Sequence, residues 1–301
     1  MKNEGFTLSE ILITLGIIGV VAAVTLPVLI DKIKDNEYDR ARQKALNIVG
    51  EACKILAVQG ELTQSNNAEN FVKDYLSKQL KIAKTCGTNI TECGFSEKIN
   101  KLGNTGEITM PTVIKDLVKG GYPLERSNTI PKIKNSTGFS FVSSNGYSML
   151  LFYNPYCLGD SNVSGHYGVD RVCVNVIYDM NGSRKPNEVG KDIGYVSVLF
   201  PDETVTAVAP RFQPKSEAYI YESPKTYASR ICKGNYTLPT KNEGATVAFN
   251  NSILDFKSSE CNATSTMVNE NTNWMYDTAG DHVTMRHGSI TGRQGIRCVK
   301  R

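Results

Sequence analysis

The sequence predicts an α+β protein with one long N-terminal helix, an antiparallel β-sheet head and a small C-terminal α+β module. Three observations predict this class: an uncharged apolar run near the N-terminus, a helical apolar stripe beyond it, and later segments in which apolar and polar residues alternate. The 301 residues are 40% apolar and 21% charged, so the chain is neither disordered nor a protein with many membrane spans. At about 100–200 residues per domain, this length suggests two domains.

The apolar run extends from Ile11 to Ile30 and contains no charged residue. A helix of about 20 residues crosses a hydrocarbon layer about 30 Å thick. A secretory signal peptide would have a shorter apolar core followed by a cleavage site, whereas here a charged helical pattern follows directly. We therefore expect residues 6–30 to form the single membrane-spanning and assembly segment.

Beyond the span, apolar residues recur every three or four positions, which predicts that the helix continues with one face against the head. Pro27 is expected to kink the helix, because it removes one backbone hydrogen bond, and Gly60 is its expected end. Both parts together predict one helix of about 50 residues. The stripe consists of Tyr38, Ala41, Ala45, Ile48, Val49, Ala52, Ile55 and Leu56.

Residues 31–210 are expected to form the head, including the continuation of the helix. The clearest signal is Asn145-Gly146 between two alternating runs, which predicts a β-hairpin over residues 139–153. Several prolines then follow closely and place a boundary, so residues 211–301 are expected to form the C-terminal module. The other elements expected in the head are two helices, at 68–84 and 111–119, and three strands, at 171–179, 194–200 and 204–209.

Glu10 stands at the head of the apolar run. A carboxylate at the centre of a membrane costs about 2.5–3.5 kcal/mol, so an acid in such a segment usually has a partner. The stretch from Gly5 to Leu12, with the sequence GFTLSEIL, resembles the type IV pilin and type II secretion pseudopilin family. The alternative is an ordinary signal anchor in which Glu10 lies among the lipid headgroups.

The resemblance implies that residues 1–5 are a leader and that a membrane prepilin peptidase cuts between Gly5 and Phe6. Phe6 would become the N-methylated first residue of the mature chain. The resemblance also implies that Glu10 pairs with the N-terminal ammonium group of Phe6 in a neighbouring subunit, so that two half-buried charges compensate each other. Glu4 departs from the basic leaders of the family.

The function that the resemblance implies is that of a pilin-like or pseudopilin subunit, assembled into a type IV pilus or a type II secretion pseudopilus. Its expected partners are other subunits, prepilin peptidase and the inner membrane. It would be made as a single-pass precursor in the bacterial inner membrane, with its head in the periplasm or outside the cell.

The sequence gives little support to other classes of function. The net charge of +4 has no dense Lys/Arg run behind it, which argues against nucleic-acid binding. The three histidines are isolated, and the chain contains no Gly-x-Ser-x-Gly elbow, P-loop or dinucleotide fingerprint, so we expect no enzyme.

Eight cysteines in a protein exposed outside the cytoplasm predict disulfides. Cys53 and Cys261 are left without an assigned partner, and Cys53, beside the apolar stripe, fits a buried free thiol. No Cys-x-x-Cys motif occurs, so neither a zinc site nor a thioredoxin-like role is expected. The favoured pairs close a short loop, join two expected neighbouring strands, or tie the start of the last module to its end: Cys86 with Cys93, Cys157 with Cys173, and Cys232 with Cys298.

The loop of residues 179–192 lies between two expected strands, and its side-chain oxygens surround Gly182. Calcium prefers such oxygen ligands, and some pseudopilins bind calcium in a loop of the sheet. The loop is not an EF-hand, since its fifth and twelfth positions are Ser183 and Gly190. The alternative is a tight structural turn, in which the same side chains cap backbone groups and Gly182 supplies a positive φ. No other cofactor is expected, and the candidate calcium ligands are Asp179, Asn181, Asn187 and Asp192.

The last part of the chain contains, in this order, Cys232, Leu238, Pro239, Thr240, Glu243, Trp274, Arg297 and Cys298. Through these residues, the segment 211–301 resembles a shortened C-type-lectin-like module, without that family's calcium and sugar triplets. The resemblance implies a helix after Leu-Pro-Thr and a Cys232–Cys298 bridge; Trp274 is expected in the core.

Two alternative functions rest on this module. One is a pilus-tip adhesin. The other is a membrane-anchored enzyme related to lectin-like sulfatase-modifying oxidases, which a structural Cys232–Cys298 bridge would exclude.

Overall fold

The chain forms two compact units, Met1–Ala41 and Arg42–Arg301, and each is described by itself. The expected cleavage site and most of the short helix expected at 111–119 lie outside the described residues. The computed structural model describes residues 7–111, 138–155, 157, 172–200, 204–213, 219–220, 232, 235–254, 260–269, 272–279, 282–289, 294–295 and 298–300.

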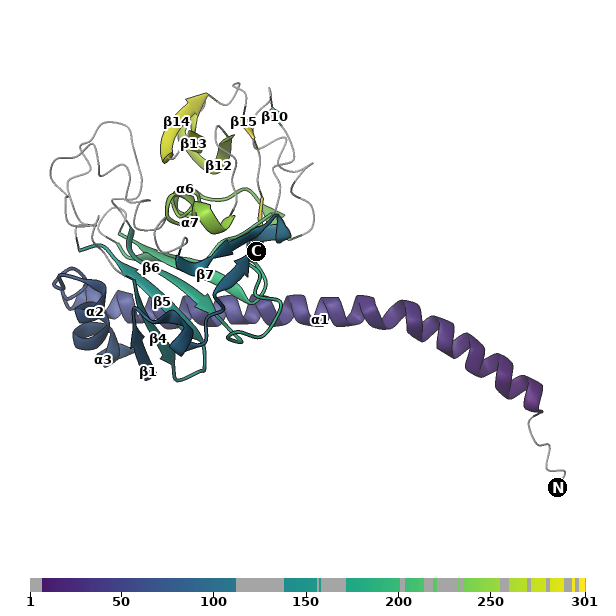
Figure 1. The fold of residues 1–301 in the computed structure, drawn as a ribbon. Helices are drawn as coiled ribbons and strands as arrows, with labels where there is room; N and C mark the ends of the chain where they lie inside the picture. The colour runs from purple at the N-terminus through teal and green to yellow at the C-terminus, as the bar shows by residue number, and fades with distance from the viewer. Residues whose placement is uncertain are drawn as a thin grey trace. The chain divides into compact units, whose positions relative to one another are not determined.

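Helix α1 extends over Leu8–Val58, 51 residues with Pro27 inside, as the sequence predicts (Figure 1). Its end is fixed by two backbone hydrogen bonds, from Gly60 N to Ala57 O at 3.0 Å and from Glu61 N to Leu56 O at 2.8 Å. Gly60 has a φ of +73°, the left-handed conformation that closes such a helix end.

The second part of α1, from residue 42 on, packs into the head. Gly50 lies so close to strand β8 (Thr206–Val208) that a Cβ added to it would be 2.9 Å from the Cβ of Ala207. The helix therefore needs a glycine at this point of close approach. The buried side chains on this face are Ala45, Val49, Ala52, Cys53 and Leu56, in one core cluster with Phe71, Val72, Leu76, Val174, Val176, Val196 and Val198.

The helix expected over residues 68–84 is shorter than predicted. It consists of α2 (Ala68–Asn70), a π-helical turn (Phe71–Leu76) and α3 (Ser77–Gln79). Leu80 is extended, with φ −121° and ψ 123°, and β1 (Ile82–Gly87) follows it. The end of the predicted helix is wrong, because pairing of residues 82–87 with strand β4 (Phe139–Ser143) overrides their weak local preference for helix.

The head is built on a six-stranded sheet in the order β1-β4-β5-β6-β7-β8, with all neighbours antiparallel. The predicted hairpin is confirmed as β4 and β5, with Gly146 at φ +82° in its turn. Every residue of β6 is buried, because both faces of the sheet are covered. The strands are β4 (Phe139–Ser143), β5 (Ser148–Tyr153), β6 (Val172–Asp179), β7 (Ile193–Leu199) and β8 (Thr206–Val208).

The second face of the sheet packs against residues from the C-terminal part of the chain. Phe212, Val247 and Val299 lie in one buried cluster with Ile177 and Leu199 of the sheet. Helix α6 (Lys241–Ala245) begins with a capping box between Thr240 and Glu243, directly after Leu-Pro-Thr, and α7 (Val247–Leu254) follows.

A buried polar cluster joins these helices to the sheet. The side-chain amides of Asn175 and Asn250 form two mutual hydrogen bonds, each of 3.1 Å. Ser197 Oγ donates to Asn175 Oδ1 at 2.6 Å, and the hydroxyls of Tyr195 and Thr246 lie 3.2 Å apart. Residues 241–254 therefore belong to the same packed unit as the sheet.

Two further sheets complete the C-terminal part, in the orders β10-β15-β12-β13-β14 and β11-β16-β9. Helices together with antiparallel strands confirm the α+β class. These strands are β9 (Arg211–Phe212), β10 (Tyr219–Ile220), β11 (Tyr236–Thr237), β12 (Glu260–Asn269), β13 (Thr272–Ala279), β14 (His282–Ser289), β15 (Gln294–Gly295) and β16 (Val299–Lys300).

Candidate functional site

Glu10 lies in the first turn of α1, where it caps the helix together with Thr7. Thr7 N and Thr7 Oγ1 each donate to Glu10 Oε2 at 2.8 Å, and Glu10 N donates to Thr7 Oγ1 at 3.3 Å. Sequence reasoning missed Thr7, although Thr-x-x-Glu is the pattern of a capping box. Neither contact from Thr7 uses Glu10 Oε1, so one carboxylate oxygen lies outside the cap.

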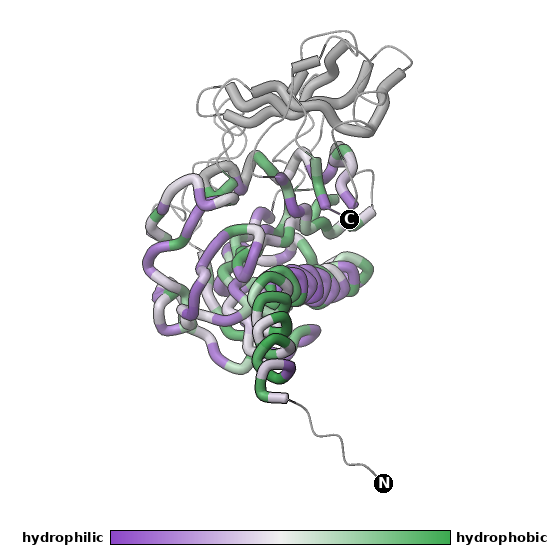
Figure 2. The backbone as a smooth tube through the Cα atoms, turned by 90° about the vertical axis from the view of Figure 1, so that its right-hand side faces the viewer, coloured by the Kyte–Doolittle hydropathy of each residue, from purple (hydrophilic) through white to green (hydrophobic). Residues whose placement is uncertain are grey.

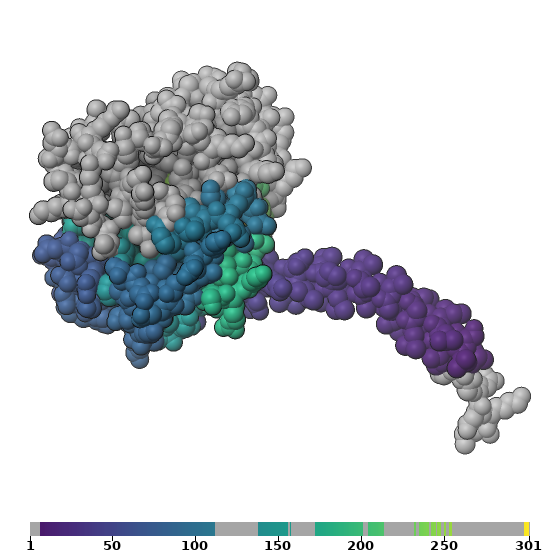
Figure 3. Space-filling model, in the orientation of Figure 1, coloured from purple at the N-terminus to yellow at the C-terminus, as the bar shows by residue number. Residues whose placement is uncertain are grey.

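The apolar part of α1 is suited to a lipid environment. Its large side chains from Leu8 to Ile30 are exposed. Figure 2 shows that these turns are predominantly hydrophobic, and Figure 3 shows the same helix in space-filling form. Thr14 Oγ1 donates to Glu10 O and Thr25 Oγ1 to Val21 O, both at 2.8 Å, so these hydroxyls are satisfied within the helix. Among the described residues, α1 alone is long and apolar enough to cross a membrane.

Asp179 and Asp192, two of the candidate calcium ligands, cap the backbone of the loop between β6 and β7. Asp179 Oδ1 accepts hydrogen bonds from the backbone N–H groups of Asn181 at 3.0 Å and Gly182 at 2.9 Å. Asp192 accepts from Asn187 N and Glu188 N, both at 2.8 Å. Gly182 has a φ of +69°. These contacts are those of the structural turn that the sequence allowed.

The backbone caps leave three buried side-chain oxygens of the loop without a hydrogen bond. Asp179 Oδ2, Asn181 Oδ1 and Asn187 Oδ1 are buried and have no hydrogen-bond partner. A buried acceptor without a partner costs about 1–3 kcal/mol. Burial also raises the pKa of Asp179 to about 7, and the nearby charge of Asp192 acts in the same direction. A bound cation would give the three oxygens a partner and would stabilise the charged form of Asp179.

The donors of the loop fit a hard cation. Carboxylate and amide oxygens are the ligands that calcium takes. No group of three or more His, Cys, Asp or Glu residues suitable for a metal occurs in the described part of the chain. A metal in this loop would need the two asparagine oxygens beside the carboxylates.

The cysteines form the three pairs that the sequence favoured. Cα–Cα distances are 5.8 Å for Cys86–Cys93, 4.9 Å for Cys157–Cys173 and 5.7 Å for Cys232–Cys298. Cys53 is a buried free thiol, and its burial raises the pKa of the thiol to about 12. The side chains of Cys261 and Trp274 lie outside the described residues, so expectations about them stay predictions.

Comparison with known proteins identifies the N-terminal segment. Residues 1–26 match the family model described as the prokaryotic N-terminal methylation motif. The match supports the type IV pilin and pseudopilin family, a substrate of prepilin peptidase and a structural subunit rather than an enzyme. The motif and the apolar helix are consistent with a membrane-anchored precursor.

The remaining comparisons add no relative. Neither the curated proteins nor the solved structures contain a significant match to this chain. The resemblance of residues 211–301 to a C-type-lectin-like module is not confirmed.

Proposed function

With the N-terminal methylation motif as the premise, we propose that this chain is a filament subunit of the type IV pilus or type II secretion pseudopilus class. Prepilin peptidase cuts it between Gly5 and Phe6, Phe6 is N-methylated, and the mature subunits assemble through α1. The observation that carries the proposal is a single acid, Glu10, directly before the exposed and uncharged apolar run of α1 from Ile11 to Ile30.

The geometry around Glu10 supports its role in assembly. The cap from Thr7 holds Oε2, which fixes the carboxylate beside the first turn of α1. In the filament, the amine of Phe6 in an adjacent subunit compensates this charge. The apolar side chains of α1 pack against those of neighbouring copies, which removes them from lipid and from water.

The location of the head follows from the same proposal. Three disulfides form and persist in an oxidising compartment such as the periplasm or the cell exterior. We place the head there, with the leader on the cytoplasmic side. No contact among the described residues favours the adhesin or the enzyme alternative, and the division at residue 211 stays a prediction.

Mass spectrometry of the mature N-terminus tests the proposal. A chain that begins at Phe6 and carries one added methyl group is expected. A Gly5→Ala variant is expected to keep its leader, because a side chain at this position hinders close approach of the peptidase. An intact Met1 or a cleavage beyond the apolar run in the wild-type protein would contradict the proposal.

We also propose that the loop of residues 179–192 binds one calcium ion and that this stabilises the head. Asp179, Asn181, Asn187 and Asp192 would hold the ion. When bound, calcium supplies positive charge to two buried carboxylates and a ligand partner to the three unpaired oxygens. The loop connects β6 to β7, so the effect falls on the centre of the sheet.

Isothermal titration of the full chain in detergent micelles tests the calcium site. Asp179→Asn removes one charge and keeps the acceptor that caps the turn, so it is expected to weaken calcium binding without unfolding the loop. Asp74→Asn, on an exposed position, is the matched control and is expected to bind like the wild type. Equal affinity in both variants would exclude Asp179 as a ligand.

A further inference from the structure

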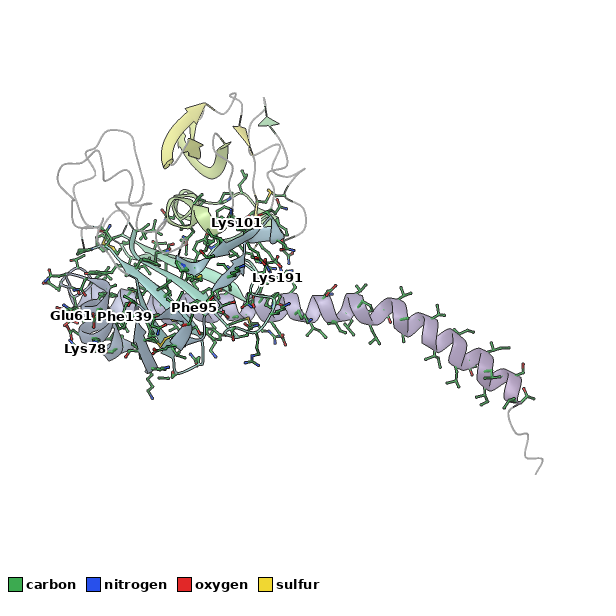
Figure 4. The ribbon with its side chains drawn as sticks, in the orientation of Figure 1. Glu61, Lys78, Phe95, Lys101, Phe139 and Lys191 are labelled. Atoms are coloured by element: carbon green, nitrogen blue, oxygen red, sulfur yellow. A yellow bond between two sulfur atoms is a disulfide. The ribbon has the colours of Figure 1, made fainter. Side chains whose placement is uncertain are left out.

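One segment of the head packs against the loop of residues 179–192, which is the proposed calcium site. We call residues 86–110 the strap; it contains the Cys86–Cys93 disulfide and a hairpin of β2 (Lys98–Asn100) and β3 (Glu107–Thr109). Figure 4 labels Phe95 and Lys101 of the strap and Lys191 of the loop. The strap contacts the loop of residues 179–192 at three places.

The first contact is a close approach of two backbone segments, at Gly94 and at Gly182. A Cβ added to Gly182 would lie 3.3 Å from the carbonyl oxygen of Gly94, and one added to Gly94 would lie 3.8 Å from the Cα of Gly182. Both glycines have positive φ angles, +87° for Gly94 and +69° for Gly182. Gly182 follows Asn181 and donates to Asp179, so the strap touches the turn that presents these two ligands.

The second contact is a set of hydrogen bonds to Asn100. Asn100 N donates to Asn187 O at 2.8 Å, and Val189 N donates to Asn100 O at 3.0 Å. Asn100 Nδ2 also donates to Pro186 O at 3.4 Å. The strap thereby fixes the backbone on both sides of Asn187, which is the third candidate ligand.

The third contact is apolar. Gly190 has a φ of +86°, and a Cβ added to it would lie 2.7 Å from Leu102 Cδ1. Leu102 is buried in the same cluster as Val189 and Ile193. The end of the loop, next to Asp192, is therefore packed against the strap.

The Cys86–Cys93 disulfide constrains the backbone at the N-terminal end of the strap. Cys93 directly precedes Gly94, and its carbonyl oxygen accepts a hydrogen bond from Ser148 Oγ of β5. Without the bridge, residues 87–93 could close their loop only at an entropic cost. The first strap contact depends most directly on this bridge, because Gly94 is the residue after it.

We propose that the Cys86–Cys93 disulfide and cation binding at residues 179–192 are energetically coupled through the strap. The inference rests on the calcium site proposed above. The strap holds the loop in its binding geometry before the ion arrives, which reduces the ordering cost of binding. Because coupling is reciprocal, a bound ion stabilises the strap by the same free energy.

The test compares calcium affinities of full-length variants in micelles by titration calorimetry. Cys86→Ser with Cys93→Ser is expected to bind calcium about tenfold more weakly than the wild type, a typical coupling. Cys157→Ser with Cys173→Ser is the matched control. Cys173 and Asp179 are six residues apart along β6, about 20 Å, so this pair is expected to stay within about twofold of the wild type.

Three further measurements make the test decisive. Leu102→Ala keeps every disulfide and is expected to weaken binding severalfold, which tests the contact between strap and loop. If the double serine variant does not fold, reduction of Cys86–Cys93 by dithiothreitol in the wild type tests the disulfide side, because reciprocal coupling requires calcium to slow it. Calcium is also expected to slow amide exchange at residues 98–102 in the wild type. Calcium binding that is unchanged in both strap variants, with unchanged exchange, would overturn the coupling alone. The absence of calcium binding in the wild type would overturn both the site and the coupling.

Discussion

Asn250→Ala tests whether residues 241–254 are an integral part of the head. The variant loses both hydrogen bonds to Asn175, at 3.1 Å, and the one from Asn250 Nδ2 to Thr246 O, at 2.9 Å. At about 1 kcal/mol per hydrogen bond, the free energy of unfolding is expected to fall by about 3 kcal/mol. Asn175 Nδ2 would also remain buried without its partner.

Urea unfolding of the full chain, followed by circular dichroism, measures this loss. With a slope of about 3 kcal/mol per molar urea, the midpoint is expected to fall by about 1 M. Asn66→Ala, at an exposed position, is the matched control and is expected to change stability little. The double variant Asn175→Ala/Asn250→Ala is expected to lose less than the sum of the single losses, since the two amides pair with each other. A midpoint for Asn250→Ala equal to that of Asn66→Ala would show that the Asn175–Asn250 pair does not stabilise the head.

Three more predictions concern the head. Gly50→Val should lower stability by about 1–3 kcal/mol through overpacking against Ala207, seen as a lower Tm; an unchanged Tm would show that helix α1 and strand β8 can separate. Because the folded-state pKa of Asp179 is raised to about 7, above about 3.9 in the unfolded chain, the folded state binds more protons between these values. Stability without calcium should therefore fall as pH rises from about 4 to 7, and a rising urea midpoint would contradict this. In a Cys261→Ser background, Cys53 should react with maleimide only after unfolding; rapid labelling of the folded protein would show that this thiol is accessible.

Much of the fold could be predicted because its signals are local. The apolar run and stripe of α1, the Gly60 end and the Asn145-Gly146 hairpin depend on periodicity and turn chemistry within the segments themselves. The three favoured cysteine pairs followed from the same expected order of elements.

The differences from prediction have non-local causes. Residues 82–87 form a strand because β4 offers them an antiparallel partner, which no local pattern contains. The pairing of Asn175 with Asn250 joins residues 75 positions apart, so the sequence alone could not connect residues 241–254 to the sheet.

The candidate sites were partly visible in the sequence. The four loop residues 179, 181, 187 and 192 were identified from their side-chain oxygens, but the sequence could not show which oxygens the turn would leave unpaired. Thr7 carries no charge, so the unpaired charge of Glu10 does not by itself point to it. Its capping-box pattern was present in the sequence and would have identified it.

The role of Glu10 in assembly is tested most directly by the yield of filaments that a Glu10→Ala variant forms in cells. Filaments are sheared from the cells and quantified by immunoblot, and the mature N-terminus is checked by mass spectrometry. Processing after Gly5 is expected to be retained while the filament yield falls to background. Thr14→Val, one turn further along the same helix, should assemble normally. Glu10→Ala filaments at the wild-type level would contradict the claim that this carboxylate pairs with the amine of a neighbouring subunit.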